Sequence, residues 1–346
     1  MSNASERQGP GLVVAVVGAT GLVGRTMIQI LEERNFPVAE LRPLAASASG
    51  RSVRFRGAEI PVAEAMPDAF EGVDIALFSA GAGASLQLAP EAAKRGCTVV
   101  DNSSAWRMDP TVPLVVSQVN PEALDGHQGI IANPNCSTMQ LAPLLHALQQ
   151  AAGLRRVVVA TYQAVSGAGG DSVEDLRAQQ RALVAGETPA STTVRHAVVL
   201  SPIPAIDIFL PDGSTKEETK VVNESRKILS LPALRISATA VRVPVEVGHS
   251  EAVHVELERP LSPESARTVF AQTAGVFVQD DPATHTYPLA AEAAGSDGIF
   301  VGRVRVDQSV ENGLAFWVVS DNVRKGAATN AVEIAELLVA RRLLHE

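Results

Sequence analysis

The chain has 346 residues, of which 46% are hydrophobic and 19% charged, and its formal net charge is −9. This length is enough for two domains that each bury a core, and no apolar run approaches the ~18 residues that a membrane span needs. The acidic balance argues against a nucleic-acid-binding surface, so an anionic substrate must be bound by a local cluster of arginines and lysines. The two cysteines, Cys97 and Cys136, are too few for a disulfide framework, which fits a reducing, cytoplasmic environment.

The N-terminal region has the pattern of a dinucleotide-binding unit. Residues 1–10 are polar and are expected to form a flexible tail. The apolar run over residues 12–17 predicts a buried strand, and residues 25–34 predict a helix with one apolar side. The loop between them has the spacing G-x-x-G-x-x-G, whose bare backbone lets a pyrophosphate approach a helix N-terminus; an ordinary strand-to-helix turn is the alternative. The expected cofactor contacts here are Gly18, Thr20, Gly21, Leu22, Val23 and Gly24.

The end of the second strand indicates which dinucleotide binds. A strand that holds the ribose 2′-hydroxyl of NAD ordinarily ends in Asp or Glu. The strand near residues 41–44 is instead followed by Ser47, Ser49 and Arg51. Hydroxyls and a cation suit the 2′-phosphate of NADP, so the sequence favours NADP. A solvated loop charge is the alternative interpretation of Arg51.

Further strands precede polar or small residues. Residues 73–79 and 98–100 read as strands, and polar residues 101–104 follow the second of them. In open parallel sheets, ligands bind at such carboxyl ends of strands. Arg107 comes shortly afterwards and could be an anion clamp or a surface ion pair.

The stretch Asn133-Pro134-Asn135-Cys136-Ser137-Thr138 joins a short apolar run to a helical pattern. Asn-Pro-Asn is turn chemistry, and Ser and Thr are helix-capping types, so Cys136 is expected at or just before a helix N-terminus. Backbone N–H groups and the helix dipole there favour a thiolate, which is the nucleophilic form. A buried, inert cysteine is the alternative, but such residues have apolar neighbours.

The second half predicts a sheet with polar loops. Residues 157–162 form a strand, and the loop at 163–170 offers an amide and backbone N–H groups beside a site, or is a plain linker. Residues 172–175 and 214–217 resemble helix-capping patterns. Glu217, Lys220 and Glu224 share one face of the second helix, which continues to Leu229; a solvated charge stripe is the usual meaning of this spacing.

The last third reads as antiparallel strands followed by a helix. Residues 238–247 and 252–258 alternate as strands, with His249 in a glycine turn between them. Residues 300–306 and 314–320 form a hairpin. A long amphipathic helix over residues 327–344 closes the chain.

Nine segments, taken in one order, resemble the aspartate-semialdehyde dehydrogenase family. They are residues 17–24, 101–108, 133–138, 163–167, 204–207, 216–220, 242–245, 248–250 and 320–322. The resemblance implies an NADP-dependent enzyme that reduces L-aspartyl 4-phosphate to L-aspartate 4-semialdehyde through a cysteine thioester. The pathway so implied is the biosynthesis of lysine, threonine, methionine and diaminopimelate, and the protein is implied to be a homodimer or a dimer of dimers, with no metal.

The family pattern also implies a role for each matching residue. Cys136 is the nucleophile, His249 the acid/base, and Gln163 orients the substrate. Cofactor contacts are added at Ser166, Gly167 and Asn322. The implied substrate-binding residues are Asn135, Arg242 for the substrate carboxylate, Glu217 for its amine, and Arg107 with Lys220 for the phosphate.

The expected fold is α/β in two domains. Residues 11–132 are expected to form a Rossmann-like domain with a parallel sheet, and residues 133–320 an α+β catalytic and dimerisation domain with a largely antiparallel sheet. Residues 321–346 are implied to return to the cofactor domain as a helix.

The sequence departs from the family at two positions. The loop after the second strand lacks the family's arginine for the 2′-phosphate; Arg51 could replace it, or NAD could be used as well. Gln118 stands where the family commonly has glutamate, and nothing in the sequence explains this difference. The alternatives are an N-acetyl-glutamyl-phosphate reductase, whose Asn-Pro-Gly-Cys-Tyr pattern disagrees with Asn135 and Ser137, and a catalytically silent binding subunit.

Overall fold

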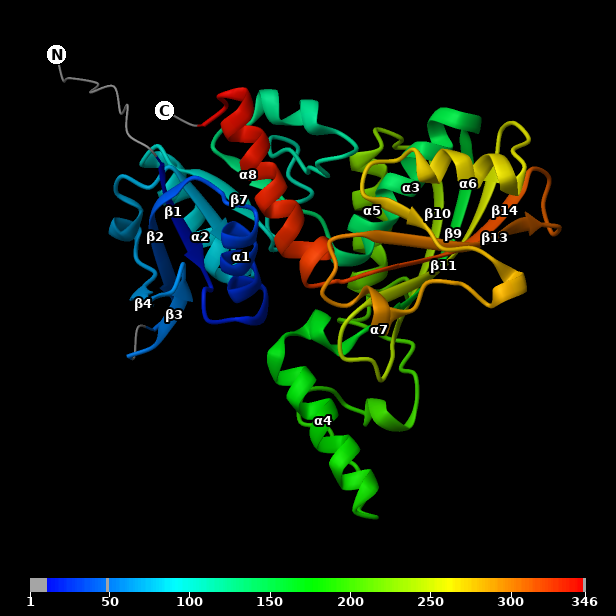
Figure 1. Cartoon of the computed structure of the whole chain (residues 1–346), viewed down its shortest axis with the longest axis horizontal. Helices are drawn as coiled ribbons and strands as arrows, with labels where there is room; N and C mark the ends of the chain where they lie inside the picture. Colours follow the sequence, from blue (N-terminus) through cyan, green and yellow to red (C-terminus); the bar gives the residue numbers. More distant parts are fainter. Residues whose placement is uncertain (1–10, 48–49, 345–346) are drawn as a thin grey trace.

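The first part of the chain forms a six-stranded sheet in the order β5-β2-β1-β6-β7-β8, in which every pair is parallel. The computed structural model describes residues 11–47 and 50–344, so the proposed tail and Ser49 lie outside the described residues. The predicted Rossmann-like parallel sheet is confirmed, and it forms the lobe at the left of Figure 1. Its elements are β1 (Leu12–Val17), α1 (Leu22–Glu33), β2 (Val38–Ala45), β5 (Ala63–Glu64), β6 (Ile75–Phe78), α2 (Gly81–Lys94), β7 (Thr98–Asp101) and β8 (Ile130–Ala132), beside the hairpin β3 (Ser52–Phe55) and β4 (Ala58–Pro61).

The continuous apolar run of β1 follows from burial on both faces. Val14 and Val16 pack in one core with α1 and the C-terminal helix, whereas Ala15 and Val17 pack in a second core with α2. Because successive side chains of a strand point to opposite faces, a sheet covered on both sides needs apolar residues at every position.

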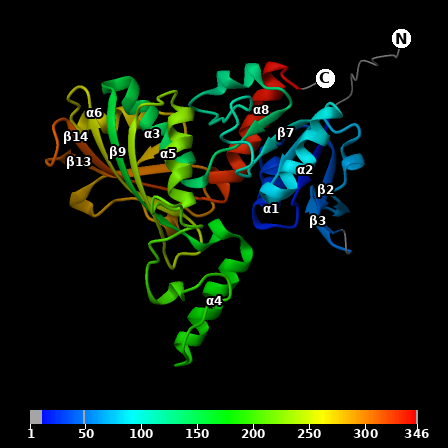
Figure 2. The ribbon, with the colours of Figure 1, turned by 180° about the vertical axis from the view of Figure 1, so that it is seen from behind.

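The second lobe contains a six-stranded mixed sheet in the order β10-β9-β11-β14-β13-β12. Its three central pairs are antiparallel and its two edge pairs parallel, so the predicted largely antiparallel sheet is confirmed. One face packs against α3, α5 and α6, seen from behind in Figure 2. The elements are α3 (Cys136–Ala152), β9 (Leu154–Gln163), α4 (Gly170–Val184), α5 (Lys216–Ile228), β10 (Arg235–Arg242), β11 (His249–Leu257), α6 (Pro263–Ala271), β12 (Val276–Val278), α7 (Ala290–Ala293), β13 (Ile299–Asp307) and β14 (Gly313–Ser320).

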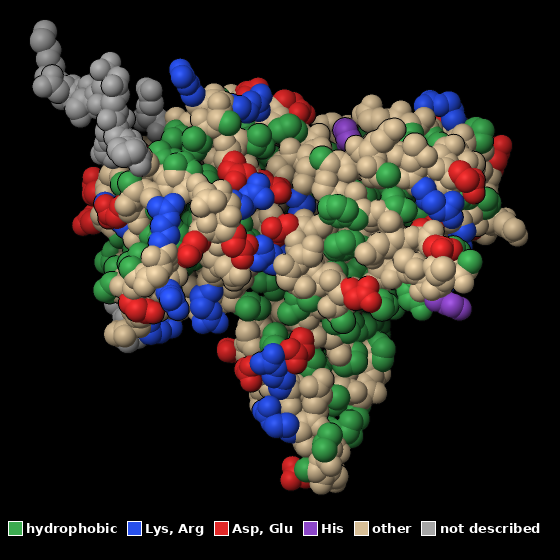
Figure 3. Space-filling view, viewed as in Figure 1, with side chains coloured by type: hydrophobic (Ala, Val, Ile, Leu, Met, Phe, Trp, Pro, Cys, Tyr) green, Lys and Arg blue, Asp and Glu red, His purple; other side chains and the backbone are tan. Residues whose placement is uncertain are grey.

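A helical arm that begins with α4 projects away from the second lobe (Figures 1 and 3). The buried Asp175 carboxylate accepts hydrogen bonds from the Ser191 hydroxyl at 2.7 Å and the Thr192 backbone N–H at 2.9 Å, which fastens the following loop to the helix. The arm also exposes large apolar side chains, among them Val184 at 90% and Leu200 at 59%. No helix in residues 11–47 and 50–344 is long and apolar enough to cross a membrane.

After β14 the chain crosses back to the first lobe. A π-helical turn, Arg324–Thr329, contacts both α1 and α3, and α8 (Asn330–Arg341) then packs in the core of the first lobe. The single helix predicted over residues 327–344 is therefore wrong in its first turn and its end, since wider π geometry precedes the α-helix and Arg342 is left-handed with φ 55°.

Several predicted boundaries are also wrong. The strand predicted over residues 238–247 ends at Arg242, and His249 begins β11 instead of lying in a turn. Helix α4 begins two residues before the predicted cap at Ser172, with Gly169 as its N-cap. The capping box of α5 pairs Thr215 with Glu218, one residue later than predicted. Each capping motif depends on backbone geometry, which residue type alone does not specify.

The buried ion pair between Lys325 and Glu333 gives a test of this junction. The Lys325 side chain is 1% exposed and its ammonium lies 2.9 Å from the carboxylate. Glu333→Ala leaves that cation without its charge partner, and we expect the free energy of unfolding to fall by roughly 3–5 kcal/mol in urea titrations.

Glu336→Ala is the matched control on the same helix. It removes a pair with Arg34 in which both side chains are 34% exposed, so the expected loss is below about 1 kcal/mol. Equal losses in the two variants would contradict the assigned burial of Lys325.

Candidate active site

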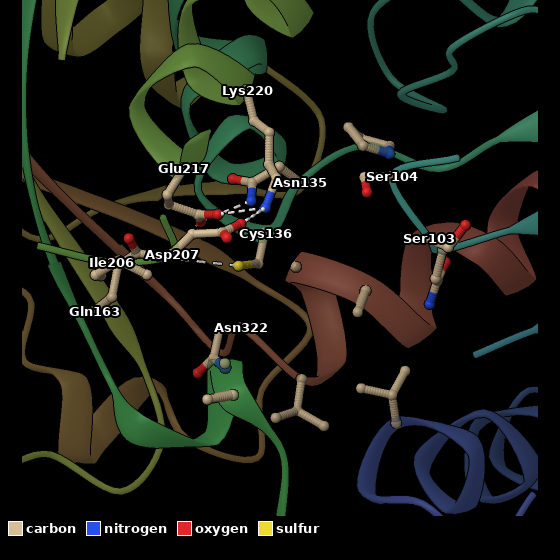
Figure 4. A pocket seen from close by; sticks show the side chains of 18 of the residues that line it. Ser103, Ser104, Asn135, Cys136, Gln163, Ile206, Asp207, Glu217, Lys220 and Asn322 are labelled. Carbon is tan, nitrogen blue, oxygen red and sulfur yellow. Dashed lines mark hydrogen bonds and ion pairs between the residues drawn. The ribbon is translucent and has the colours of Figure 1, made fainter. Parts of the chain in front are cut away.

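A cavity of about 460 Å³ lies where the two lobes meet, and Figure 4 shows its interior. The first lobe contributes the ends of its strands, including Ser79 and Asn102 after β6 and β7. The second lobe contributes Cys136 from α3 and Gln163 from the end of β9. Segments that are far apart in the sequence therefore meet where ligands bind in open parallel sheets.

Cys136 is the first residue of α3, as the sequence predicted. The capping residue is Asn135 rather than Ser137 or Thr138: its side-chain oxygen accepts from the backbone N–H groups of both, at 3.0 and 3.3 Å. Gly326 of the π-helical turn packs against the cysteine, because a Cβ built there would lie 3.1 Å from Cys136 Cβ. The nucleophile candidate is thus held between a capped helix end and a side-chain-free wall.

The surroundings of Cys136 oppose the thiolate that the helix end favours. Burial raises the pKa of the Cys136 thiol to about 12, and the Glu217 carboxylate adds to the rise. Arg107, Arg242 and the Ser137 N–H act in the opposite direction but do not cancel it. The helix end was the only one of these influences on the pKa that the sequence showed, and burial outweighs it.

Glu217 connects the groups around the cysteine. One of its carboxylate oxygens accepts from Asn135 Nδ2 at 2.8 Å and from Gln163 Nε2 at 3.1 Å, and the other accepts from Lys220 Nζ at 3.0 Å. The same Gln163 nitrogen lies 4.0 Å from the Cys136 sulfur. Lys220 and these hydrogen bonds lower the pKa of Glu217 despite burial, so the carboxylate is ionised beside the thiol.

Three cationic side chains line the same cavity. Lys220 also donates to Asp207 at 2.9 Å, and the Arg242 guanidinium donates to the Ala164 carbonyl at 2.6 Å. Arg107 comes from the loop after β7 and forms a buried ion pair with Glu224 at 3.0 Å. The surface interpretation of Arg107 is therefore wrong, because the residue is 8% exposed. The site therefore gathers three cations, two of which are paired with carboxylates.

His249 is fully buried and does not line the cavity. Its Nδ1 accepts a hydrogen bond from the Ala164 N–H at 3.0 Å, so in the neutral ring the proton is on Nε2. Nε2 has no hydrogen-bond partner among the described residues. Burial and the nearby Arg242 cation lower the pKa of His249 to about 3. Gly167 covers the ring, since a Cβ there would lie 3.1 Å from Nε2.

The glycine-rich loop is tightly packed. Gly18 has φ 83°, and a Cβ there would lie 2.4 Å from the Ser79 carbonyl oxygen; one at Gly24 would lie 2.1 Å from the Gly18 carbonyl oxygen. Only glycine fits either position. Gly21 is the N-cap of α1, and no side chain makes a capping hydrogen bond there. The backbone N–H groups of Leu22 and Val23 are therefore available to an anion at this helix end.

Two further sets of predicted cofactor residues lie beside this loop and the cavity. Arg51 donates to the Thr20 hydroxyl at 3.2 Å and to the Ser47 carbonyl at 2.9 Å, which brings the second strand's loop to the glycine loop. Ser166 and Asn322 hydrogen-bond each other at 2.9 Å, and both line the cavity with Gly167. No group of three or more His, Cys, Asp or Glu side chains in the described ranges could hold a metal ion.

Sequence reasoning gave no role to four residues that shape the site: Asp207, Glu224, Lys227 and Gly326. Asp207 has φ 70°, unusual for a residue other than glycine, and pairs with Lys220. The shared face of α5 was noted, but a solvated stripe was the usual interpretation of that spacing. The apolar residues Val221 and Ile228 on the same helix were the sequence signal that α5 is partly buried, because both pack in the core.

A dinucleotide-type glycine loop beside an interlobe cavity, with a cysteine at a capped helix end in that cavity, is typical of a nicotinamide-dependent dehydrogenase. Comparison with protein families agrees: residues 13–127 match the semialdehyde dehydrogenase NAD-binding domain and residues 141–325 the semialdehyde dehydrogenase dimerisation domain. The chain belongs to the aspartate-semialdehyde dehydrogenase family.

Individual relatives are similar over nearly their whole length. The aspartate-semialdehyde dehydrogenase of Aquifex aeolicus is 52% identical, covering 96% of this chain and 100% of the relative, and that of Bacillus subtilis is 48% identical, covering 95% and 98%. Among solved structures, aspartate semialdehyde dehydrogenase II of Vibrio cholerae, crystallised as a complex with ASA, is 45% identical with a TM-score of 0.93. Its alignment covers 96% of this chain and 99% of that one.

The raised pKa of Cys136 predicts its reactivity with a thiol-alkylating reagent. Because the pKa is about 12, the thiolate fraction grows about tenfold per pH unit throughout the range 7–9. We expect the alkylation rate constant with iodoacetamide to rise log-linearly over that range without a plateau.

Cys136→Ser is the control, since Cys97 is fully buried and should contribute no fast phase. A plateau below pH 9 in the wild-type protein would show that the cationic side chains outweigh burial.

Proposed function

We propose that this protein is an NADP-dependent aspartate-semialdehyde dehydrogenase that reduces L-aspartyl 4-phosphate to L-aspartate 4-semialdehyde through a thioester on Cys136. The observation that carries the proposal is the convergence of Cys136 and Gln163 with three cations on one cavity. The names of relatives at 48–52% identity support it. The product would feed the biosynthesis of lysine, threonine, methionine and diaminopimelate.

The charges around the cavity suit the three charged groups of this substrate. Arg242 would bind the α-carboxylate, and the ionised Glu217 would bind the ammonium. Arg107 and Lys220 would bind the phosphate, and Asn135 would support the substrate beside Glu217. Charge-assisted hydrogen bonds of this kind are stronger than neutral ones. A short substrate that carries both an ammonium and anionic groups matches these side chains better than a longer N-acetylated substrate, which has no ammonium for Glu217.

The first chemical step is acyl transfer to sulfur. The Cys136 thiolate attacks the acyl carbon, the carbon–oxygen bond to phosphate breaks, and the phosphate leaves with its bonding electron pair. Arg107 and Lys220 stabilise the charge on the leaving group. Pairing of the substrate ammonium with Glu217 removes the nearest negative charge from the thiol, which favours its ionisation.

The second step reduces the thioester. NADPH, when bound at the glycine loop, supplies a hydride to the acyl carbon. His249 carries its proton on Nε2 and would donate a hydrogen bond from it to the oxygen that becomes negative. This role requires the Gly167 segment to move off the ring. Re-forming the carbonyl releases the thiolate and the aldehyde, so the cysteine is regenerated.

NADP is the proposed cofactor because of the Arg51 contacts. The guanidinium is already beside Thr20 and Ser47, next to the glycine loop. It would replace the arginine that the family has earlier in this loop, at a site that includes Ser47. The contacts to Ser166, Gly167 and Asn322 would lie at the nicotinamide side.

The proposed assembly is a homodimer in the cytoplasm, through the sheet face opposite α3. Tyr162 and Trp317 pack against each other on that face with tilted rings whose centroids are 5.3 Å apart, and Tyr162 is 38% exposed. Exposed aromatic and apolar side chains on a sheet face indicate a protein interface. The match of residues 141–325 to a dimerisation domain supports the homodimer.

The decisive test is an assay of the purified chain in the oxidative direction, with both semialdehydes and both cofactors. We expect phosphate-dependent reduction of NADP with aspartate semialdehyde. Cys136→Ser should abolish turnover by at least about 10³-fold while NADP binding, followed by fluorescence titration, is retained. Activity confined to N-acetyl-glutamate semialdehyde would replace the proposed substrate.

A separate prediction concerns Arg51. Arg51→Ala should raise the KM for NADP about tenfold or more, because a cation facing the 2′-phosphate is lost, and should leave the KM for NAD within about twofold. Arg54→Ala, on the exposed face of β3, is the control. Equal effects on both cofactors would remove the 2′-phosphate role from Arg51.

A further inference from the structure

Glu224 joins two loops that the proposed mechanism uses. One carboxylate oxygen accepts from Arg107 Nη1 at 3.0 Å, and the other accepts from the backbone N–H of Asn135 at 2.6 Å. The side chain is 1% exposed and does not line the cavity. It therefore acts only through residues that do: Arg107, and Asn135 directly before the nucleophile.

These contacts also determine how Arg107 presents its donors. Nε donates to the Asn133 carbonyl at 2.9 Å and Nη2 to the Asn102 carbonyl at 2.6 Å, in addition to the Nη1 contact with Glu224. A guanidinium has five N–H groups, so one N–H remains on each terminal nitrogen. Two such donors side by side match the spacing of two phosphate oxygens.

Lys227, one turn further along α5, holds the same loop from the other side. Its ammonium donates to the backbone carbonyls of Arg107 at 2.8 Å, Asp109 at 2.7 Å and Val112 at 2.9 Å. The loop follows β7 of the first lobe, whereas α5 belongs to the second. Arg107 thus lies on a loop of the first lobe, but its contacts hold it against α5 of the second lobe.

We propose that Glu224 is a positioning residue for the phosphate site: it holds the Arg107 guanidinium and the Asn135–Cys136 turn at one fixed spacing, with Lys227 as a second fastening. This inference rests on the proposed function. A phosphoryl group bound by Arg107 then lies at a constant distance from the sulfur even when the lobes move. Misplacement of an orienting group costs rate and affinity without changing the chemistry.

Glu224→Gln tests the proposal with little change in shape. Glutamine has one carbonyl oxygen, so either the Arg107 or the Asn135 donor faces an amide NH₂ group instead of an acceptor. In the oxidative assay we expect the KM for inorganic phosphate to rise about tenfold or more and kcat to fall. The KM for NADP should stay within about twofold of wild type. A general loosening of the fold would raise the KM for NADP as well.

Asp280→Asn is the matched control. Asp280 also pairs with an arginine, Arg267, at 2.7 Å, accepts from a backbone N–H, and has a side chain 1% exposed, but it lies outside the cavity lining. We expect both KM values and kcat to stay within about twofold of wild type in this variant.

Lys227→Met provides a second route if Glu224→Gln is insoluble. It keeps the apolar stem, removes the three contacts to the loop, and should raise the KM for phosphate by about threefold or more. Wild-type protein inactive with aspartate semialdehyde would overturn the proposed function. Active wild type with phosphate KM values unchanged in the variants would overturn the positioning role alone.

Discussion

The site depends on two buried carboxylates, Glu217 and Glu224, on one face of α5. They are seven residues apart, which is two helical turns, so both point to the same side. Between them they accept from both the side chain and the backbone of Asn135, and they pair with Lys220 and Arg107. A single helix therefore positions the Asn135–Cys136 turn and both candidate phosphate cations, and a shift of this helix would move all of them.

The same carboxylates limit the chemistry that the site performs by itself. They make it possible to bury cations in an acidic protein, because a buried charge without a partner is far more costly than a paired one. Cys136 is harder to ionise as a result, because burial and the Glu217 carboxylate both raise its pKa. A substrate ammonium that pairs with Glu217 would remove part of this effect, so ionisation of the thiol would be coupled to binding of the correct substrate.

The two lobes contact each other at several places besides the segments in which the chain passes from one to the other. The π-helical turn after β14 packs Gly326 against Cys136, and α8 enters the core of the first lobe. The loop with Arg107 runs the other way, from the first lobe to α5. The end of the glycine loop and Cys136 therefore both lie at a cavity whose walls come from the two lobes. Gly167 covers His249 at that boundary.

The amino-acid sequence by itself determined the parallel and antiparallel sheets, the glycine loop, and the placement of Cys136 at a helix start, because periodicity and turn chemistry are local properties. Which residue caps α3, where α4 and β10 begin and end, and the covering of His249 were decided only by tertiary structure. So were the charge state of the thiol and the pairing of Arg107 with Glu224, residues 117 positions apart. Burial and long-range contacts set these properties, and neither can be read from residue type and spacing alone.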